Sequence, residues 1–346
     1  MTSPSAGGGL SWAVIGTGLI SQLIANDLAV TPGADCYAVV SRDQAKANAF
    51  ADEHGFSVAY SDLHRMLADP DVDIAYVGTP HATHAGIAVA ALEAGKHVLI
   101  EKPIAVDAGE AQRIADAAAA SGRFAMEAMW MRFLPAYRGA VVAALSGAIG
   151  DVRSVRASFG LPFDAPDSPR WSAERASSTL LDQAIYPVTL ALDVLGAPDR
   201  VCGSGCIRPD GVDLAEHMTF DYADGRFAQL AASMVDYAEP TATISGTEGW
   251  ITIPAPFWSA SEYQKRSGPI PDALARVDTT AFTRDGYGYV PMLAAVTEVI
   301  VAGLTEHPLH PLADSVATLS MLDAIRRSIT ETSHDQRSTH EAHIVQ

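Results

Sequence analysis

The sequence predicts an α/β fold. It combines an N-terminal Rossmann domain, with a doubly wound parallel sheet, and a C-terminal α+β domain built on an open, mostly antiparallel sheet. Three observations predict this. Short apolar strands alternate strictly with helical segments in the first part of the chain, and a glycine-rich turn follows the first strand. From about Asp151 the pattern changes to longer strands. Strict alternation of strand and helix indicates right-handed crossovers between parallel strands.

In the first part we expect five short apolar strands, at residues 11–15, 37–40, 74–77, 98–100 and 124–126. Helices are expected around them, ending near residue 30 and then at residues 45–54, 61–68, 84–94 and 107–121. The last of these helices begins with Asp107 as its N-cap and carries Glu110 three residues later, the form of a capping box.

In the second part we expect strands at residues 152–159, 200–207, 215–222, 227–235, 241–246 and 250–253. The Asp224-Gly225 pair predicts a hairpin turn between two of them. Helices are expected at residues 179–195, 292–304 and 314–330. The predicted organisation is a flexible tail, a dinucleotide-binding domain, a substrate and dimerisation domain and a polar tail, at residues 1–10, 11–128, 129–332 and 333–346.

Composition restricts the classes of function. The chain has 346 residues and a formal net charge of −18, which argues against nucleic acid and anionic membranes as partners. Its apolar runs are too short for a membrane span, and its first residues do not form a signal peptide. Three cysteines fit a reducing cytoplasm. We expect Cys202 and Cys206 to be buried thiols and we expect no metal site.

The turn after the first strand reads Gly16-Thr17-Gly18-Leu19-Ile20-Ser21. The first glycine allows a tight turn, and the second lets the backbone approach a pyrophosphate at the start of the following helix. Ser21 stands where a third glycine is usual, which weakens the motif, whereas its position between a strand and a helix strengthens it. The alternative is a purely structural glycine turn.

The second strand ends in Ser41-Arg42-Asp43. A hydroxyl followed by a guanidinium suits a ribose 2′-phosphate, so we expect NADP as the cofactor. A solvated surface arginine is the alternative for Arg42. Because Asp43 could hold a ribose 2′-hydroxyl, NAD stays possible.

Charged residues end another predicted strand, at Glu101-Lys102-Pro103. From the residues alone, this pair either faces a cofactor cleft at the end of a parallel strand or is a surface pair before a helix. Thr79-Pro80 closes the neighbouring predicted strand, and His84 follows at the start of a helix.

Three of these motifs occur in order at spacings that resemble the glucose–fructose oxidoreductase / inositol dehydrogenase (Gfo/Idh/MocA) family, over roughly residues 10–330: the Gly16 turn, the segment 79–84 and Glu101-Lys102-Pro103. Residues 126–133 and 180–186 further resemble the branch that holds dimeric dihydrodiol dehydrogenases and NADP-dependent D-xylose dehydrogenases. In that branch a tyrosine, here Tyr186, stands where many relatives have histidine.

The resemblance implies roles for particular residues. Lys102 would be catalytic, and the peptide bond before Pro103 would be cis. Cofactor contacts would come from Gly16, Thr17, Gly18, Leu19, Ile20, Ser41, Arg42, Thr79, Pro80, His84, Glu101 and Lys102. Substrate contacts would come from Lys102, Trp130, Arg132, Asp182 and Tyr186.

Asp182 and Tyr186 lie four residues apart on an expected helix, so we expect them to share one face with their polar groups toward a cleft. A buried, hydrogen-bonded tyrosine is the alternative. Trp130 and Arg132 could line the substrate pocket or pack between the domains. Residues 177–179 depart from the glycines usual in the family, and Pro187 is expected to kink the helix.

The sequence therefore predicts an NAD(P)-dependent oxidoreductase, cytoplasmic, that moves a hydride between nicotinamide and a CH–OH carbon of a sugar, polyol or cyclic trans-diol. A catalytically silent NAD(P)-binding sensor on the same fold is the alternative. The substrate stays open because it depends on loops such as residues 161–170. The direct proton carrier also stays open between Tyr186 and Lys102. Apolar residues in both alternation sets of the later strands, namely Phe227, Leu230, Ala232 and Met234, predict a homodimer through the C-terminal sheet.

Overall fold

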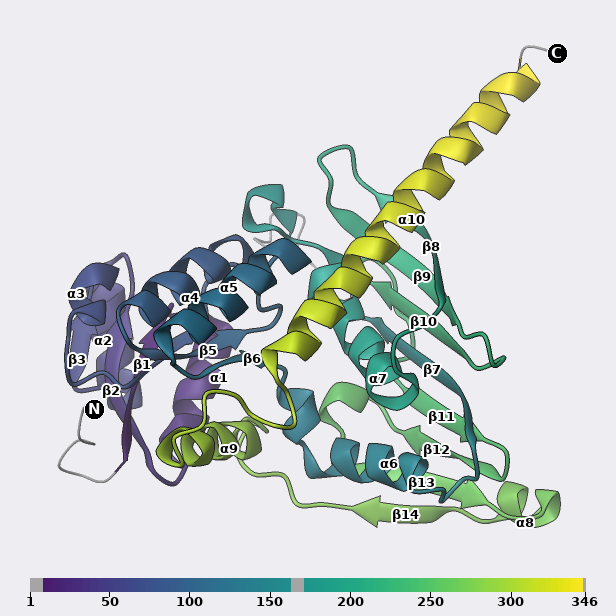
Figure 1. Ribbon diagram of the computed structural model, residues 1–346, viewed down its shortest axis with the longest axis horizontal. Coiled ribbons are helices and arrows are strands. Elements are labelled where there is room, and N and C mark those ends of the chain that lie inside the picture. The colour runs from purple at the N-terminus through teal and green to yellow at the C-terminus, as the bar shows by residue number, and fades with distance from the viewer. Residues whose placement is uncertain (1–8, 163–170, 345–346) are drawn as a thin grey trace. The chain divides into compact units, whose positions relative to one another are not determined.

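The computed structural model describes residues 9–162 and 171–344, with side chains described up to residue 331. Most of the predicted N-terminal tail, residues 163–170 of the predicted pocket loop and the side chains of the predicted polar tail lie outside the described residues. The chain divides into two compact units (Figure 1). The first comprises residues 1–133 and 284–317, and the second comprises residues 134–283 and 318–346.

The first unit is built on a six-stranded parallel sheet with the order β3-β2-β1-β4-β5-β6, so the predicted Rossmann fold is confirmed. Its strands are β1 (Leu10–Ile15), β2 (Ala34–Val40), β3 (Val58–Tyr60), β4 (Ile74–Val77), β5 (His97–Glu101) and β6 (Ala125–Ala128). The sequence did not predict β3, whose three residues are half-buried at the sheet edge.

Helices cover the parallel sheet on both faces, as right-handed crossovers require. In Figure 1, α4 and α5 lie side by side over one part of the sheet and α1 lies on the opposite side. The helices of this unit are α1 (Leu19–Leu28), α2 (Gln44–His54), α3 (Leu63–Leu67), α4 (His84–Glu93), α5 (Ala108–Ser121), α9 (Val290–Val301) and the start of α10 (Leu312–Ile344). The predicted N-cap of α5 is confirmed, because Asp107 accepts a hydrogen bond from the amide of Glu110 at 2.8 Å.

The second unit contains an eight-stranded sheet with the order β14-β13-β12-β11-β7-β10-β9-β8. Its strands are β7 (Val152–Gly160), β8 (Arg200–Ile207), β9 (Asp213–Asp221), β10 (Phe227–Ser233), β11 (Ala242–Gly246), β12 (Gly249–Ile253), β13 (Glu262–Ser267) and β14 (Asp278–Ala281). Only β7 and β10 pair in parallel, so the predicted mostly antiparallel sheet is confirmed.

The helices of the second unit are α6 (Pro135–Leu145), α7 (Ile185–Leu195), α8 (Ile270–Ala275) and most of α10. α7 packs on β7 and β10, and α6 packs on β12 and β13. The sequence did not predict α6, α8, β13 or β14. α10 (yellow in Figure 1) also extends beyond the predicted helix at residues 314–330.

One expectation about burial was wrong. Cys202 and Cys206 are exposed rather than buried, because Gly203 between them faces Ile325 and Ile329 of α10, which turns its neighbours to the other face of the edge strand β8. The two alternation sets in and just after β10 differ in burial, as a sheet with one covered face requires. Leu230, Ala232 and Met234 are buried, and of the four residues named for the interface only Phe227 is half-exposed.

No helix in the described part of the chain combines the length and the apolar character that a bilayer span requires.

Candidate active site

The predicted cofactor residues of the first unit lie at one edge of its sheet. The strands β2, β1, β4 and β5 are neighbours and run parallel, so the residues that follow them share the carboxyl edge. These residues are Gly16, Thr17, Gly18, Ser41, Arg42, Thr79, Pro80 and Lys102. The strand order reverses between β1 and β4, and open α/β sheets bind nucleotides at this switch point.

The glycine turn has the geometry that a phosphate site needs. Gly16 has a φ of +103°, and a Cβ on it would lie 2.5 Å from the carbonyl oxygen of Gly78. Gly18 precedes α1 as its N-cap, and a Cβ there would meet no atom within 4 Å. The start of α1 is therefore open to an anion, whose charge the helix dipole would favour. Leu19, the first residue of α1, is 65% exposed.

The departure at the third glycine has a structural explanation. Ser21 is buried, and its hydroxyl lies 2.5 Å from the position that a Cβ on Gly78 would occupy. The same hydroxyl lies 3.4 Å from the Gly78 carbonyl oxygen. The close approach between α1 and the end of β4 is thus achieved with a glycine on the strand side, which leaves room for a small hydroxyl on the helix.

Asp43 is the N-cap of α2. Its carboxylate accepts hydrogen bonds from the amides of Ala45 at 2.8 Å and Lys46 at 3.3 Å. Arg42 and Lys46 are both exposed in this first turn, and Ser41 is half-buried beside them. Lys46 was not among the predicted residues, because an exposed lysine in a helix carries no signal until the capping role of Asp43 is known.

Glu101 and Lys102 do not form an ordinary surface pair. Glu101 is 8% exposed and accepts a hydrogen bond from the Tyr76 hydroxyl at 2.8 Å. Lys102 follows it at the end of β5 and is half-buried. The peptide bond between Lys102 and Pro103 is cis, as the family resemblance implied.

His84 is fully buried at the start of α4 and holds two loops of the carboxyl edge. Its Nδ1 lies 2.8 Å from the carbonyl oxygen of Pro103, and its Nε2 lies 2.7 Å from that of Thr79. Burial lowers the pKa of the His84 imidazole, while the two carbonyl contacts act in the opposite direction.

Trp130 and Arg132 are both buried in the short helix that follows β6 (Trp130–Phe133). The Trp130 ring packs on Tyr289 at a centroid distance of 4.8 Å. Nη1 of Arg132 donates to Asp314 at 2.7 Å and contacts Nδ1 of His310 at 2.5 Å. All of these contacts lie within the first unit, where they join the short helix to residues 289–314.

Asp182 and Tyr186 belong to the second unit and to one continuous helical segment. Residues Leu180–Ala184 form a π-helical turn that leads directly into α7. π-turns inside helices occur frequently at functional sites. Asp182 is half-buried, whereas Tyr186 is 4% exposed. Pro187 follows within this continuous segment, and because proline has no amide hydrogen it cannot donate to the preceding π-helical turn.

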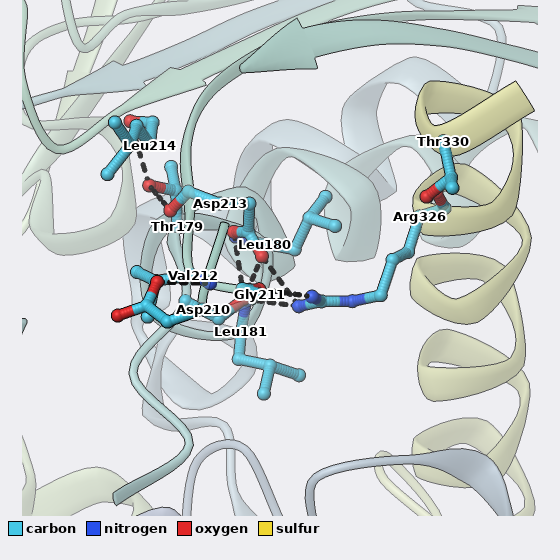
Figure 2. A network of polar contacts seen from close by, with 11 residues as sticks. Thr179, Leu180, Leu181, Asp210, Gly211, Val212, Asp213, Leu214, Arg326 and Thr330 are labelled. Atoms are coloured by element: carbon cyan, nitrogen blue, oxygen red, sulfur yellow. Dashed lines mark hydrogen bonds and ion pairs between the residues drawn. The ribbon is translucent and has the colours of Figure 1, made fainter. Parts of the chain in front are cut away.

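A buried carboxylate from β9 anchors the start of this helical segment (Figure 2). Oδ1 of Asp213 accepts the amide of Leu180 at 2.8 Å, and both carboxylate oxygens accept the Ser178 hydroxyl, at 2.9 and 2.8 Å. Nη2 of Arg326, from α10, donates to Oδ2 of Asp213 at 2.6 Å. The Thr179 hydroxyl donates to the Asp213 carbonyl oxygen at 3.0 Å. The hydroxyl residues that replace the family's glycines thus serve this anchor.

Two aromatic rings lie beside Tyr186 and were not predicted from the sequence. Phe159, at the end of β7, is 5.7 Å from the Tyr186 ring, and Trp258 is 5.9 Å from it. Phe159 and Trp258 stack on each other at 3.5 Å with an angle of 5° between their planes. The three residues come from distant parts of the sequence, so no local pattern could have joined them.

Among the side chains that the structure describes, histidines, cysteines and acids form no group of three that could hold a metal ion. A parallel sheet with a glycine-rich first turn, an open helix start and a basic residue after the second strand defines a dinucleotide-binding protein of the Rossmann type.

Comparison with known proteins identifies the family. Residues 10–129 match the Gfo/Idh/MocA oxidoreductase family with its NAD-binding Rossmann fold, and residues 140–252 match the C-terminal domain of the same family. The chain is 32% identical to trans-1,2-dihydrobenzene-1,2-diol dehydrogenase from Bos taurus over 329 residues, which cover 92% of this chain and 97% of the bovine protein. The mouse enzyme of the same name is also 32% identical, over 93% of this chain and 98% of its own length.

Solved structures show the same fold. Levoglucosan dehydrogenase in complex with NADH and levoglucosan superimposes with a TM-score of 0.84 at 24% identity, covering 93% of this chain and 98% of that one. A 3-ketoreductase from Actinomadura kijaniata in complex with NADP and TDP-benzene gives a TM-score of 0.81 at 26% identity, covering 92% and 98%. The chain belongs to the Gfo/Idh/MocA oxidoreductase family. It is an oxidoreductase of the dehydrogenase type with an NAD-binding Rossmann domain.

Proposed function

We propose that the chain is an NADP-preferring dehydrogenase that oxidises or forms a CH–OH carbon of a cyclic trans-diol or a sugar. The observation that supports the preference for NADP is the hydrogen bonding of the Asp43 side chain. Its carboxylate caps α2, while Arg42 and Lys46 are exposed beside it. A 2′-phosphate requires charge-assisted donors of this kind, whereas a free ribose hydroxyl requires an acceptor.

The substrate class is supported by the relatives. The bovine relative is named for trans-1,2-dihydrobenzene-1,2-diol, and the levoglucosan dehydrogenase structure contains an anhydrosugar. Both compounds carry neighbouring hydroxyl groups on a ring. The stacked rings of Phe159 and Trp258 beside Tyr186 offer an apolar surface that suits the face of such a ring.

The proposed reaction consists of two transfers, a hydride to the nicotinamide and a proton to a base. Bound NADP supplies the acceptor for the hydride. As the carbonyl forms, a base must take the hydroxyl proton. A tyrosine has an ordinary pKa near 10, and a neighbouring ammonium lowers such a value. We propose that Tyr186 exchanges the proton, that Lys102 favours its phenolate form and orients the hydroxyl, and that Asp182 holds an adjacent hydroxyl. Lys102 as the direct base is the alternative.

The test is turnover of NADP with a panel of cyclic trans-diols and aldoses, followed by the absorbance of the reduced nicotinamide. We expect turnover with at least one member of the panel and a higher kcat/KM with NADP than with NAD. Tight NADP binding without turnover across the whole panel would instead support a catalytically silent sensor.

We further propose that the chain is cytoplasmic and forms a homodimer through the face of the second sheet that carries Phe227. On β10, Phe227 and Ala231 are half-exposed, while the alternate residues Ala228, Leu230 and Ala232 are buried. Sedimentation at micromolar concentration should therefore show a dimer. A single species of 36.4 kDa would contradict this proposal.

A further inference from the structure

A single buried peptide unit lies one residue after Lys102 and has both of its polar groups held by ionisable side chains. The peptide joins Pro103 to Ile104, and both residues are buried. Its carbonyl oxygen lies 2.8 Å from Nδ1 of His84, and its amide donates to Oε1 of Glu127 at 3.0 Å. One side chain comes from the start of α4 and the other from β6.

His84 also fixes the neighbouring loop. Its Nε2 lies 2.7 Å from the carbonyl oxygen of Thr79, which follows β4. Because a neutral imidazole has one N–H, the ring donates to one of the two carbonyls in each tautomer, and to both only as an imidazolium. Through His84, the loop after β4 and the loop that carries Lys102 are therefore held at a common point.

Glu127 is held in turn by a buried network from the end of the first unit. Its Oε2 accepts the Ser315 hydroxyl at 2.8 Å and lies 3.2 Å from Nε2 of His310. Nδ1 of His310 faces the guanidinium of Arg132. Because a guanidinium can only donate, Nδ1 must accept, which places the ring proton on Nε2, where it is donated to Glu127.

The donors around Glu127 support a carboxylate rather than a carboxylic acid. Burial alone raises the pKa of Glu127, but the contacts from His310, Ser315 and the Ile104 amide bring it below its ordinary value. The bond to Ile104 is therefore charge-assisted, which makes it stronger than a bond between neutral groups.

We propose that His84 and Glu127 are positioning residues that fix Lys102 by clamping the Pro103–Ile104 peptide from its two sides. This inference rests on the proposed role of Lys102. With the ring proton of His84 on Nδ1, two hydrogen bonds to opposite groups of one peptide fix the orientation of its plane and the path of the chain just after the lysine. A displacement of about 1 Å in a reacting group can cost about 10²-fold in rate, so such a clamp would act on kcat.

Two conservative variants of His84 separate its contacts with the two carbonyl oxygens. The amide nitrogen of an asparagine at this position can reach the place of Nδ1, so His84→Asn preserves the bond to Pro103 and loses the bond to Thr79. A glutamine reaches the place of Nε2, so His84→Gln does the reverse. We expect His84→Gln to lower kcat by about tenfold to a hundredfold, with a small change in the KM for substrate, and His84→Asn to retain more of the activity.

A matched control separates positioning from general support of the fold. Lys96 is also buried in the first unit, and its Nζ donates to the carbonyl oxygens of Asp69 and Val72, which lie before β4 rather than after β5. Lys96→Met should lower the melting temperature and leave kcat unchanged in the folded protein. Equal losses of kcat in His84→Asn and His84→Gln, or losses that follow the melting temperature as in Lys96→Met, would overturn the clamp.

A second readout does not depend on activity. The chain has four lysines, Lys46, Lys96, Lys102 and Lys265, so reductive methylation with a ¹³C label gives four side-chain signals that can be assigned by substitution. The clamp predicts that His84→Gln shifts the Lys102 signal and leaves that of Lys265 unchanged, with a smaller shift in His84→Asn. An unchanged Lys102 signal in both variants would contradict the clamp. If Lys102→Met kept full turnover, the proposed function would fail, while the labelled spectra would still decide the clamp.

Discussion

Each of the two units contains a candidate catalytic segment, and in each unit one buried carboxylate accepts a backbone amide of that segment. In the first unit Glu127 accepts the amide of Ile104, two residues after Lys102. In the second unit Asp213 accepts the amide of Leu180, two residues before Asp182. A buried carboxylate that accepts a backbone amide is a strong anchor because the bond is charge-assisted. The two segments are thus fixed by the same kind of bond.

The two carboxylates differ in how their charge is balanced. Glu127 is surrounded by buried donors, namely the Ser315 hydroxyl and the His310 ring. Asp213 is paired with the cation of Arg326, whose side chain is 36% exposed. Salt screens exposed charges much more than buried ones. We therefore expect the anchor of the second unit to weaken with added salt, and the anchor of the first unit to be nearly insensitive to it.

The largest stability effect is expected at Asp213. Asp213→Ala leaves the Leu180 amide and the Ser178 hydroxyl without their acceptor and the Arg326 cation without its partner. Losing such a group costs about 3 kcal/mol in the free energy of unfolding, measured by urea denaturation. The kcat of the folded protein should also fall, whereas the Kd for NADP should not change, because the proposed cofactor residues lie in the first unit.

The exposed neighbour Asp210, which pairs with Arg208, provides the control for Asp213. Asp210→Ala should change stability by no more than about 0.5 kcal/mol, as is usual for surface substitutions. If Asp213→Ala were no less stable than Asp210→Ala, the anchor in Figure 2 would not hold the helix start.

The next largest effect is expected on cofactor binding by the first unit. Arg42→Asp should weaken NADP binding by at least about tenfold and spare NAD, because a fork-like contact to phosphate contributes about 1.5–3 kcal/mol. Isothermal titration of both cofactors measures this difference. Arg65→Asp, at an exposed position in α3, is the control. A wild-type protein that bound NAD more tightly than NADP would refute the interpretation of Arg42.

The smallest effect concerns a third buried carboxyl group, Glu216 of β9. Neither of its oxygens has a hydrogen-bond partner within the described part of the chain. Burial, followed by the nearby charge of Asp213, raises the pKa of Glu216 well above its ordinary value, although Arg326 lowers it. In the unfolded chain a glutamate titrates near about 4.3. Between that pH and the raised pKa, the folded protein binds more protons than the unfolded chain.

The stability due to Glu216 is therefore fully present below about pH 4.3 and is lost as the pH rises through the raised folded pKa. Glu216→Gln should flatten this fall in the free energy of unfolding, and the exposed Glu248→Gln should not. Unfolding curves measured from about pH 4.3 upward through the neutral range test the prediction. An unchanged pH dependence in Glu216→Gln would show that the carboxyl is already ionised in the folded protein.

The sequence predicted the parts of the fold that depend on local pattern. Apolar runs between glycine and proline signals located five strands of the first sheet, and the pairing of Gly16 with the following helix located the nucleotide edge. β3 was missed because it is an edge strand of only three residues, which are apolar but half-buried and follow a polar, glycine-containing stretch. Lys46 was missed because an exposed lysine in a helix carries no signal until the capping role of Asp43 is seen.

The anchors could not be predicted, because they join residues that are distant in the chain. Asp213 and Arg326 are 113 positions apart, and Glu127 and Ser315 are 188 positions apart. Nothing in the sequence near His84 shows that both of its ring nitrogens meet backbone carbonyls. Such contacts follow from the packing of whole elements, whereas periodicity reports only which face of one element is buried.

The central proposal is that Lys102 and Tyr186 serve one proton-transfer step, and a double-mutant cycle tests it most directly. The account predicts that Lys102→Met and Tyr186→Phe each lower kcat by about 10²–10⁴ while NADP binding survives. It also predicts that the double variant is little slower than the slower single variant, because residues that act as a unit are not additive. A Tyr186→Phe enzyme that retained more than about a third of the wild-type kcat, or single effects that multiplied in the double variant, would contradict the account.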